Sequence, residues 1–166
     1  MARKFRGESQ HKVDGKGRVS IPAQFRRVLE AGDPDWTDGL HPNLVIVYGD
    51  ARQKHLECYT IEAMEEVDER IAQLPRFSKK RRYLQRVMNG MSFPTSVDET
   101  GRLVLPAKLR DKAGLKDEAY FIAAGDTFQI WHPETYQDVV AAQDEAFLDE
   151  VPEGIDPLEL LDLEDF

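Results

Sequence analysis

VDGKGRVSIPAQFR, residues 13–26, is repeated later in the chain as VDETGRLVLPAKLR, residues 97–110. Seven of the fourteen aligned positions are identical, and three of the others exchange one apolar residue for another. The similarity extends downstream in the same order, with LVIVYGD at 44–50 matching YFIAAGD at 120–126. A match of this length and order predicts that the 166-residue chain contains two copies of one structural unit.

Each copy of the motif predicts a tight turn at its beginning. The carboxylates of Asp14 and Asp98 suit such a turn, because they accept hydrogen bonds from backbone N–H groups just ahead in the chain. Gly17 and Gly101 suit its tightest point, because a residue without a Cβ atom adopts a positive φ without a steric clash. An arginine follows each glycine directly.

A short strand and a helix are predicted after each turn. Val19 and Ile21 occupy alternate positions, which places them together on the core face and Arg18 on the opposite face. Pro22 then ends the strand and suits the first helical turn, where a missing N–H leaves no hydrogen bond unmade. The second copy has the same pattern of residue types.

Apolar residues alternate again after each predicted helix and indicate a β-hairpin. The first hairpin runs from LVIVYGD to LECY at 56–59, and the second runs from YFIAAGD to FQIW at 128–131. Between the two units, residues 61–74 have the apolar spacing of an amphipathic helix. The basic stretch at 78–88 predicts a second helix, and residues 133–147 predict a third.

These elements predict a mainly β protein of the α+β class, in which two similar units are accompanied by flanking helices. We expect four parts along the chain. They are a first repeat at 5–60, a helical connector at 61–90, a second repeat at 91–140 and an acidic C-terminal tail at 144–166.

The charge is unevenly distributed along the chain. The net charge is −9, but residues 144–166 hold ten acidic residues and no Lys or Arg, which leaves the first 143 residues with 22 basic and 21 acidic side chains. Residues 1–27 hold eight basic residues against two acidic ones. Because binding to nucleic acid depends on the local potential, the overall negative charge does not exclude it.

Several classes of protein are disfavoured by the sequence. No run of 18 apolar residues predicts a membrane span, and the basic N-terminus lacks the apolar core of a signal peptide, so we expect a cytoplasmic protein. The single cysteine, Cys58, forms no internal disulfide and alternates with Leu56 and Thr60 in a predicted strand, which favours a place in the core. The four histidines lack the spacing of metal ligands, and no nucleophile elbow, P-loop or dinucleotide motif occurs. We therefore expect no catalytic site, metal, cofactor or small-molecule substrate.

The double motif resembles the MraZ family over roughly residues 4–140, together with FRGE at residues 5–8, Ala113-Gly114-Leu115 and FQIW. The resemblance implies two fused SpoVT/AbrB-type repeats that exchange hairpins in a small barrel, and a ring-shaped homo-oligomer. It also implies a regulator, associated with the nucleoid, that binds double-stranded DNA at repeated sites upstream of the division and cell-wall gene cluster, including its own promoter. Gly15 and the long acidic tail depart from the family pattern.

The family's D-x-x-x-R signature falls on Asp14–Arg18 and on Asp98–Arg102. A guanidinium at the root of a strand can pair with a phosphate or with the N7 and O6 edge of guanine. The candidate nucleic-acid-binding residues are Arg18, Lys16, Arg102, Lys12, Arg6 and Arg3, and the residues that support the turns are Asp14, Gly17, Asp98 and Gly101.

Two alternatives remain open for the basic residues. Arg18 and Arg102 can instead form ion pairs with the aspartates four residues earlier and fix the turns, and this role is compatible with DNA binding. The run KKRR at 79–82 favours a solvated helix face or a subunit contact over DNA binding.

The tail suggests a second class of function. Its leucines at 158, 160, 161 and 163, with Phe166, lie among acidic residues, as in antitoxins whose acidic tails wrap a partner protein. A tail of this charge can also compete with DNA for the basic N-terminal segment.

Overall fold

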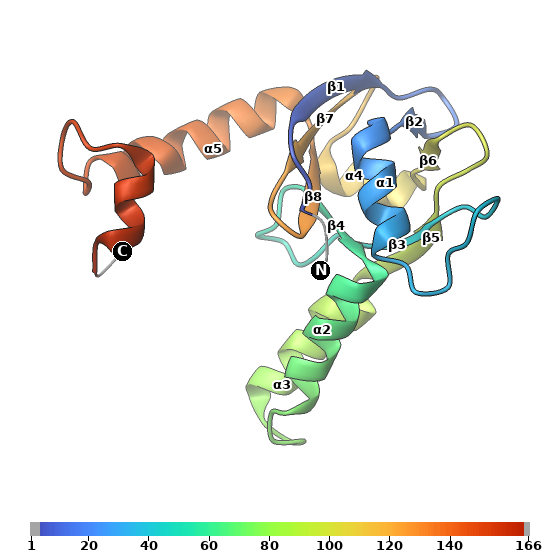
Figure 1. The fold of residues 1–166 in the computed structure, drawn as a ribbon, viewed down its shortest axis with the longest axis horizontal. Helices are drawn as coiled ribbons and strands as arrows, with labels where there is room; N and C mark the ends of the chain where they lie inside the picture. Colours follow the sequence, from blue (N-terminus) through green and yellow to red (C-terminus); the bar gives the residue numbers. More distant parts are fainter. Residues whose placement is uncertain (1–3, 165–166) are drawn as a thin grey trace. The chain divides into compact units, whose positions relative to one another are not determined.

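A computed structural model describes residues 4–164 and divides the chain into two compact units, one ending at Pro133 and the other beginning at Glu134 (Figure 1). We call residues 4–133 the body. Its elements are β1 (Glu8–Lys12), β2 (Arg18–Ser20), α1 (Ala23–Ala31), β3 (Asn43–Val47), β4 (Leu56–Thr60), α2 (Ile61–Ala72), α3 (Lys79–Gln85), the π-helical turn η1 (Arg86–Gly90), β5 (Ser92–Ser96), β6 (Arg102–Val104), α4 (Ala107–Ala113), β7 (Glu118–Ala123) and β8 (Thr127–Trp131). The second unit contains α5 (Pro133–Leu148) from its second residue onward and the 3-10 helix η2 (Pro157–Asp162).

The main sheet has six antiparallel strands in the order β1-β7-β8-β4-β3-β5. The two repeats exchange strands in it, because β1 of the first repeat pairs with β7 of the second, while β5 of the second pairs with β3 of the first. The predicted α+β class with a mainly antiparallel sheet is confirmed. Closure into a barrel and the four-part division of the chain stay predictions.

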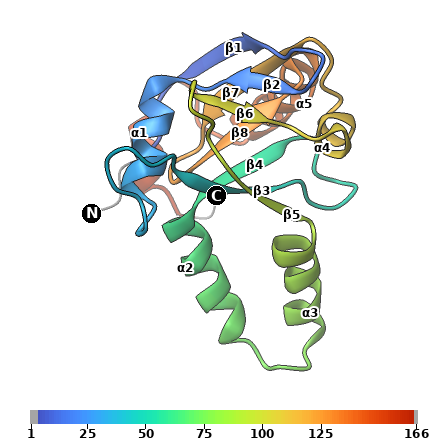
Figure 2. The ribbon, with the colours of Figure 1, turned by 90° about the vertical axis from the view of Figure 1, so that its right-hand side faces the viewer.

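A two-stranded ribbon joins the repeats a second time. β2 and β6 pair antiparallel, with Val19 opposite Leu103. The ribbon is extended at both ends by backbone hydrogen bonds, from the N–H of Ile21 to the carbonyl of Gly101 (3.1 Å) and from the N–H of Leu105 to that of Gly17 (2.8 Å). Figure 2 shows β2 and β6 side by side, with α1 beyond one end and α4 beyond the other.

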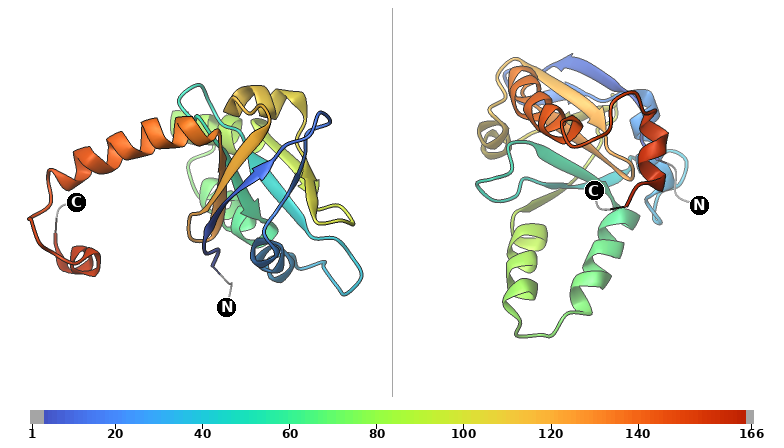
Figure 3. Two further views of the ribbon diagram at one scale, coloured as in Figure 1. Left: turned by 90° about the horizontal axis from the view of Figure 1, so that it is seen from above. Right: turned by 90° about the vertical axis from the view of Figure 1, so that its left-hand side faces the viewer.

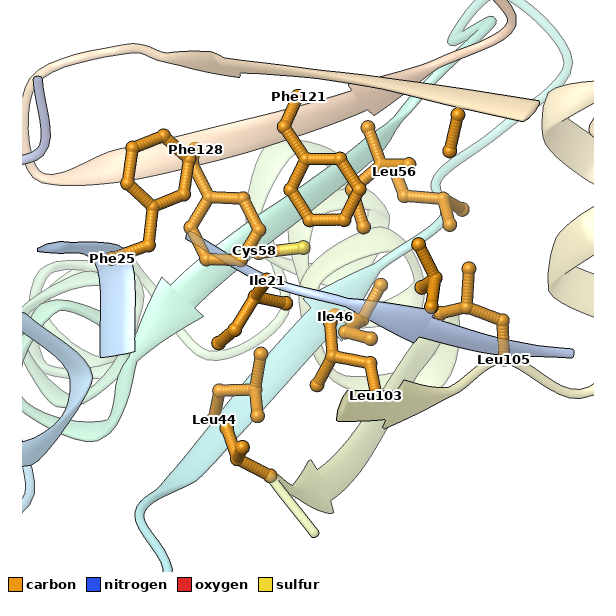
Figure 4. Packing of buried hydrophobic residues seen from close by; sticks show 14 of the residues in the cluster. Ile21, Phe25, Leu44, Ile46, Leu56, Cys58, Leu103, Leu105, Phe121 and Phe128 are labelled. Carbon is orange, nitrogen blue, oxygen red and sulfur yellow. The ribbon is translucent and has the colours of Figure 1, made fainter. Parts of the chain in front are cut away.

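The core lies between this ribbon and the main sheet. Leu103 and Leu105 of the ribbon strand are fully buried, as are Phe121 and Phe128 of the sheet (Figure 4). Phe25, Val28 and Leu29, which are spaced along one side of α1, are buried in the same cluster. The close packing of the rings, with 4.9 Å between the centroids of Phe25 and Phe128, makes the core intolerant of truncation.

Cys58 takes the place in the core that the alternation predicts. It is fully buried and lies opposite Phe128, while Leu56 lies opposite Ile130. The equivalent strands β4 and β8 of the two repeats thus contribute matching residues to the centre of the sheet.

The connector is a helical hairpin that projects from the main sheet (Figure 3). α2 begins after Thr60, whose hydroxyl accepts a hydrogen bond from the N–H of Ala63 (3.0 Å). On the apolar face of this helix Met64 and Ile71 are buried, and Val67 is half-buried. The second predicted helix forms as α3, which Ser78 caps, followed by the π-helical turn. Among the described residues, no helix is both long and apolar enough to cross a membrane.

The glycines of the two turns differ in how closely the ribbon approaches them. Gly17 has a φ of +81°, and an added Cβ would lie 2.2 Å from the carbonyl oxygen of Leu105, which is backbone and cannot move aside. Gly101 has a φ of +75°, but the nearest atom to an added Cβ is the flexible guanidinium of Arg26 at 2.9 Å. Gly15 has free space around it and no positive φ.

We therefore expect Gly17→Ala to lower the free energy of unfolding by more than the 1–3 kcal/mol, roughly, that a strained φ alone costs. Gly101→Ala should cost less than Gly17→Ala, and Gly15→Ala should be close to neutral. Urea denaturation of the three variants measures the series. Equal losses for Gly15→Ala and Gly17→Ala would contradict the tight ribbon contact.

Candidate nucleic-acid interface

The first turn is built around the carboxylate of Asp14. One carboxylate oxygen accepts hydrogen bonds from the backbone N–H groups of Lys16 and Arg18, both at 2.9 Å. The other oxygen accepts a hydrogen bond from Nε of the Arg18 guanidinium at 2.6 Å. The aspartate therefore fixes the turn and the direction of the arginine at the same time.

The second turn repeats this geometry with Asp98. Its carboxylate accepts hydrogen bonds from the N–H groups of Thr100 and Arg102 and from the Thr100 hydroxyl, each at 2.9 Å. The ion pair with Nε of Arg102 is longer, at 3.3 Å. Both ion pairs considered in the sequence analysis are present, so each arginine is held by its own turn.

The ribbon brings the two arginines onto one face. Arg18 lies opposite Val104, and Arg102 lies opposite Ser20, so that the four side chains share the face that points away from the core residues Val19 and Leu103. Arg18 and Arg102 are diagonal neighbours in this ladder, and such neighbours lie roughly 7–8 Å apart, with their Cβ atoms somewhat closer. The side chains are 37% and 34% exposed, so both guanidinium groups are accessible to solvent. We call these four residues the outer ribbon face.

The carboxylates stay ionised well into the acid range. The pKa of Asp14 is lowered from 3.8 to about 2, and the largest cause is the hydrogen bond that the backbone N–H of Arg18 donates to the carboxylate. Burial raises the pKa, whereas the hydrogen bond from the guanidinium of Arg18 lowers it further. For Asp98, burial is the largest influence and raises the pKa, but hydrogen bonds from Arg102 and Thr100 outweigh it, and the pKa is lowered. Each turn thus keeps a negative charge beside its arginine near neutral pH.

The other candidate residues are spread around the ribbon. Lys16 is exposed in the first turn, next to Arg18, and Lys12 is exposed at the end of β1. Arg6 lies near the opposite end of β1, roughly 20 Å along the strand direction, where its N–H bonds to the side chain of Gln24 on α1. Arg3 lies outside the described residues. The structure therefore brings Lys16 close to Arg18 but separates Arg6 from Lys12.

Several residues of the interface were not predicted. Ser20 and Val104, both exposed, complete the outer ribbon face. Arg110 donates from Nε to the carbonyl of Leu105 at 2.9 Å and supports the ribbon from α4, and its repeat partner Arg26 approaches Gly101. Arg26 and Arg110 are identical in the repeated motif, and this identity is the signal in the sequence that could have indicated them.

The basic run at 79–82 lies on the connector, on α3. Arg81 donates from Nη1 to the carbonyl of Leu74 at 2.8 Å and so closes the end of the hairpin. Lys79, Lys80 and Arg82 are exposed.

The alternative of a catalytic or metal site finds little support in the described part of the chain. Burial raises the pKa of the Cys58 thiol well above its usual range, which leaves it without the thiolate that a nucleophile needs. Among residues 4–164, no group of three or more His, Cys, Asp or Glu side chains is placed to hold a metal ion.

Comparison with known proteins agrees with the two repeats. The family model described as "MraZ protein, putative antitoxin-like" matches residues 4–87 and 91–156. A Ruegeria pomeroyi protein named Transcriptional regulator MraZ is 68% identical over 162 residues, covering 98% of this chain and 97% of the relative. Proteins of the same name from Cereibacter sphaeroides and Coxiella burnetii are 47% and 30% identical, covering 98% and 96% of this chain and 98% of each relative.

The lowered pKa of Asp14 predicts a specific loss of stability in acid. A carboxylate with a lower pKa in the folded than in the unfolded chain stabilises the fold above the unfolded value, and this contribution is lost as the pH falls through the folded value. For Asp14 the window runs from 3.8 down to about 2.

We expect the wild-type chain to lose more free energy of unfolding across this window than Asp14→Asn, measured by urea denaturation at a series of pH values. Glu99→Gln, which removes an exposed carboxyl from the second turn, is the matched control and should follow the wild type. Identical pH profiles for Asp14→Asn and the wild type would show that the carboxylate does not hold the turn.

Proposed function

Because the chain belongs to the MraZ family, we propose that it is a sequence-specific, DNA-binding transcriptional regulator that contacts double-stranded DNA through the outer ribbon face. The observation that carries the proposal is the pairing of β2 with β6, which presents Arg18 and Arg102 on one accessible face of a two-stranded ribbon. The major groove of B-DNA admits a ribbon of this kind.

The aspartates prepare the arginines for this contact. Each ion pair uses Nε of the guanidinium, whereas a bidentate contact to guanine O6 and N7, or to a phosphate, can use the terminal amino groups. An arginine that is already oriented loses less side-chain entropy on binding. The structural and the DNA-binding roles of the ion pairs are therefore compatible.

Assembly supplies the remaining affinity. One ribbon offers two arginines, and a bidentate base contact contributes only about 1–3 kcal/mol of discrimination. We propose a ring-shaped homo-oligomer, built on barrel-like bodies, whose copies contact successive repeated sites, because each further contact is then intramolecular. The sites we propose lie upstream of the division and cell-wall gene cluster and of the chain's own gene, and the regulator acts in the cytoplasm at the nucleoid.

The basic residues around the ribbon add contacts to the phosphate backbone. Lys16 is the first of these, because it is exposed in the turn beside Arg18. The second turn has Thr100 in the equivalent place, so its local potential is less positive. We therefore propose that Arg18 contributes more to DNA affinity than Arg102.

Substitution of the arginines tests the proposal. We expect Arg18→Ala to weaken operator binding and to reduce the slope of log affinity against log salt by about 1, with a smaller loss of affinity for Arg102→Ala. Arg18→Lys should keep the salt slope but lose discrimination between operator and random DNA, because lysine keeps the charge and lacks the planar fork. Fluorescence anisotropy with the DNA upstream of the chain's own gene measures these effects.

Arg27→Ala is the control, because Arg27 is exposed on α1 and the same positive charge is removed. An unchanged affinity for Arg18→Ala and Arg102→Ala, each with native stability, would contradict the proposal.

A protein-interaction module is the second candidate function. The family description includes the word antitoxin-like, and Leu158 and Leu161 of the tail are 72% and 82% exposed. If the chain works in this way, replacing these leucines by aspartate abolishes its effect on gene expression, whereas Arg18→Ala has little effect. The opposite pattern supports DNA regulation.

A further inference from the structure

An apolar groove runs between the two helices of the connector. It has a volume of about 370 Å³ and is lined by Val67, Arg70, Ile71, Leu74, Lys80, Leu84 and Met88. Figure 2 shows α2 and α3 standing apart below the sheet, away from the ribbon that carries the candidate DNA interface. The groove therefore belongs to a different surface from the one proposed to bind DNA.

The rim of this groove is strongly basic along α3 and around the loop that joins the two helices. Residues 70–90 contain seven basic residues and no acidic one; these are Arg70, Arg76, Lys79, Lys80, Arg81, Arg82 and Arg86. All of them except Arg81 are exposed. Two large apolar side chains lie beside them on the surface, with Phe77 75% exposed and Tyr83 44% exposed. The acidic residues Glu66, Asp68 and Glu69 lie on α2 at the other end of the groove, where Asp68 accepts a hydrogen bond from Asn89. The part of the groove that is apolar at its centre and basic at its rim suits an acidic peptide with apolar side chains.

The C-terminal segment of the chain has this complementary chemistry. Residues 152–166 contain six acidic residues and no basic one. Leu158 and Leu161 of η2 are 72% and 82% exposed, and Leu163, which follows η2, is 38% exposed. Three exposed leucines within six residues form an apolar surface of the kind with which proteins bind one another.

We propose that the acidic leucine segment at 157–163 of one copy of the chain binds in the α2–α3 groove of a second copy. The leucines enter the groove, and the carboxylates face the arginines and lysines on its rim. The lengths agree, because η2 extends about 12 Å at 2.0 Å per residue and the lining from Val67 to Leu74 extends roughly 10 Å at 1.5 Å per residue. This inference does not depend on DNA binding by the ribbon.

A nucleic acid is the less suitable occupant of the same groove. The phosphates of a nucleic acid would pair with the basic residues of the rim. A nucleic acid has no aliphatic side chains, however, that could pack against Ile71, Leu74 and Leu84. The segment at 157–163 has carboxylates for the basic rim and leucines for the apolar lining, and we therefore assign the groove to it.

Peptide binding to the full-length chain tests the proposal. The receptor carries Leu158→Asp and Leu161→Asp, so that its own tail does not compete, and the probe is a fluorescein-labelled peptide of residues 152–166. We expect the peptide to bind, and Arg70→Glu with Lys80→Glu in the receptor to weaken binding about tenfold, as each reversal replaces an attraction by a repulsion. Both positions are exposed, and circular dichroism verifies that the helices persist.

Two controls separate this contact from general charge attraction. Arg27→Glu with Lys116→Glu changes the net charge of the receptor equally at exposed positions outside the groove, and it should leave peptide binding unchanged. A scrambled peptide of the same composition should bind at least about tenfold more weakly, because its leucines no longer match the groove. Equal binding of the scrambled peptide, an equal loss in the control receptor, or no binding of the native peptide overturns the proposal.

A cross-link between copies tests whether the contact is intermolecular. Cys58 is fully buried and does not interfere. A chain with Met88→Cys is mixed with one carrying Leu161→Cys, and the thiols are oxidised by dissolved oxygen. The mixture should form a disulfide-linked dimer on a non-reducing gel in larger amount than either variant alone. In the control, Leu40→Cys, at an exposed position on the body, replaces Leu161→Cys. The proposal fails if the control pair cross-links equally. It also fails if Arg70→Glu with Lys80→Glu lowers the affinity for random duplex DNA and leaves peptide binding unchanged.

Discussion

The antiparallel pairing of β2 with β6 is the constraint on which the rest of the structure depends. It is closed at each end by a backbone hydrogen bond to the carbonyl of a turn glycine, Gly17 or Gly101. Because successive side chains of a strand point to opposite faces, this one register buries Leu103 and Leu105 and exposes both arginines. The core and the candidate interface are therefore two faces of the same ribbon, and a slip of one residue would destroy both.

The elements that the sequence predicts well are those set by local chemistry. The turn, strand and helix of each motif follow from an aspartate, a glycine and a proline at fixed spacing, and the structure has them at the expected residues. The strand exchange was harder to predict from the residues. Apolar and polar residues do not alternate clearly in β1 and β5, and β5 contains Pro94. The sequence therefore indicates neither segment strongly as a strand. The strands that pair with β1 and β5 belong to the other repeat. Because the two repeats have similar sequences, the residues of β1 and β5 do not indicate which of the two hairpins each strand joins.

The candidate site, too, was predictable only where local sequence determines it. Alternation placed Arg18 and Arg102 away from the core, and the aspartates four residues earlier suggested the ion pairs that the structure contains. That both arginines share one face depends on pairing between residues far apart in the chain, which the sequence does not specify. The separation of Arg6 from Lys12 along β1 has the same origin. The charge pattern points to a protein with two distinct surfaces, one presented by the ribbon and one by the connector.

Photo-crosslinking from Ser20 is the most direct test of DNA binding by the outer ribbon face, because this exposed residue lies opposite Arg102 on that face. A photoreactive side chain at position 20 is compared with one at the exposed position Lys79 on α3, with the DNA upstream of the chain's own gene as target. If the outer ribbon face meets DNA, position 20 forms adducts to bases and position 79 forms none. Adducts from position 79 alone would show that the ribbon is not the surface that meets DNA.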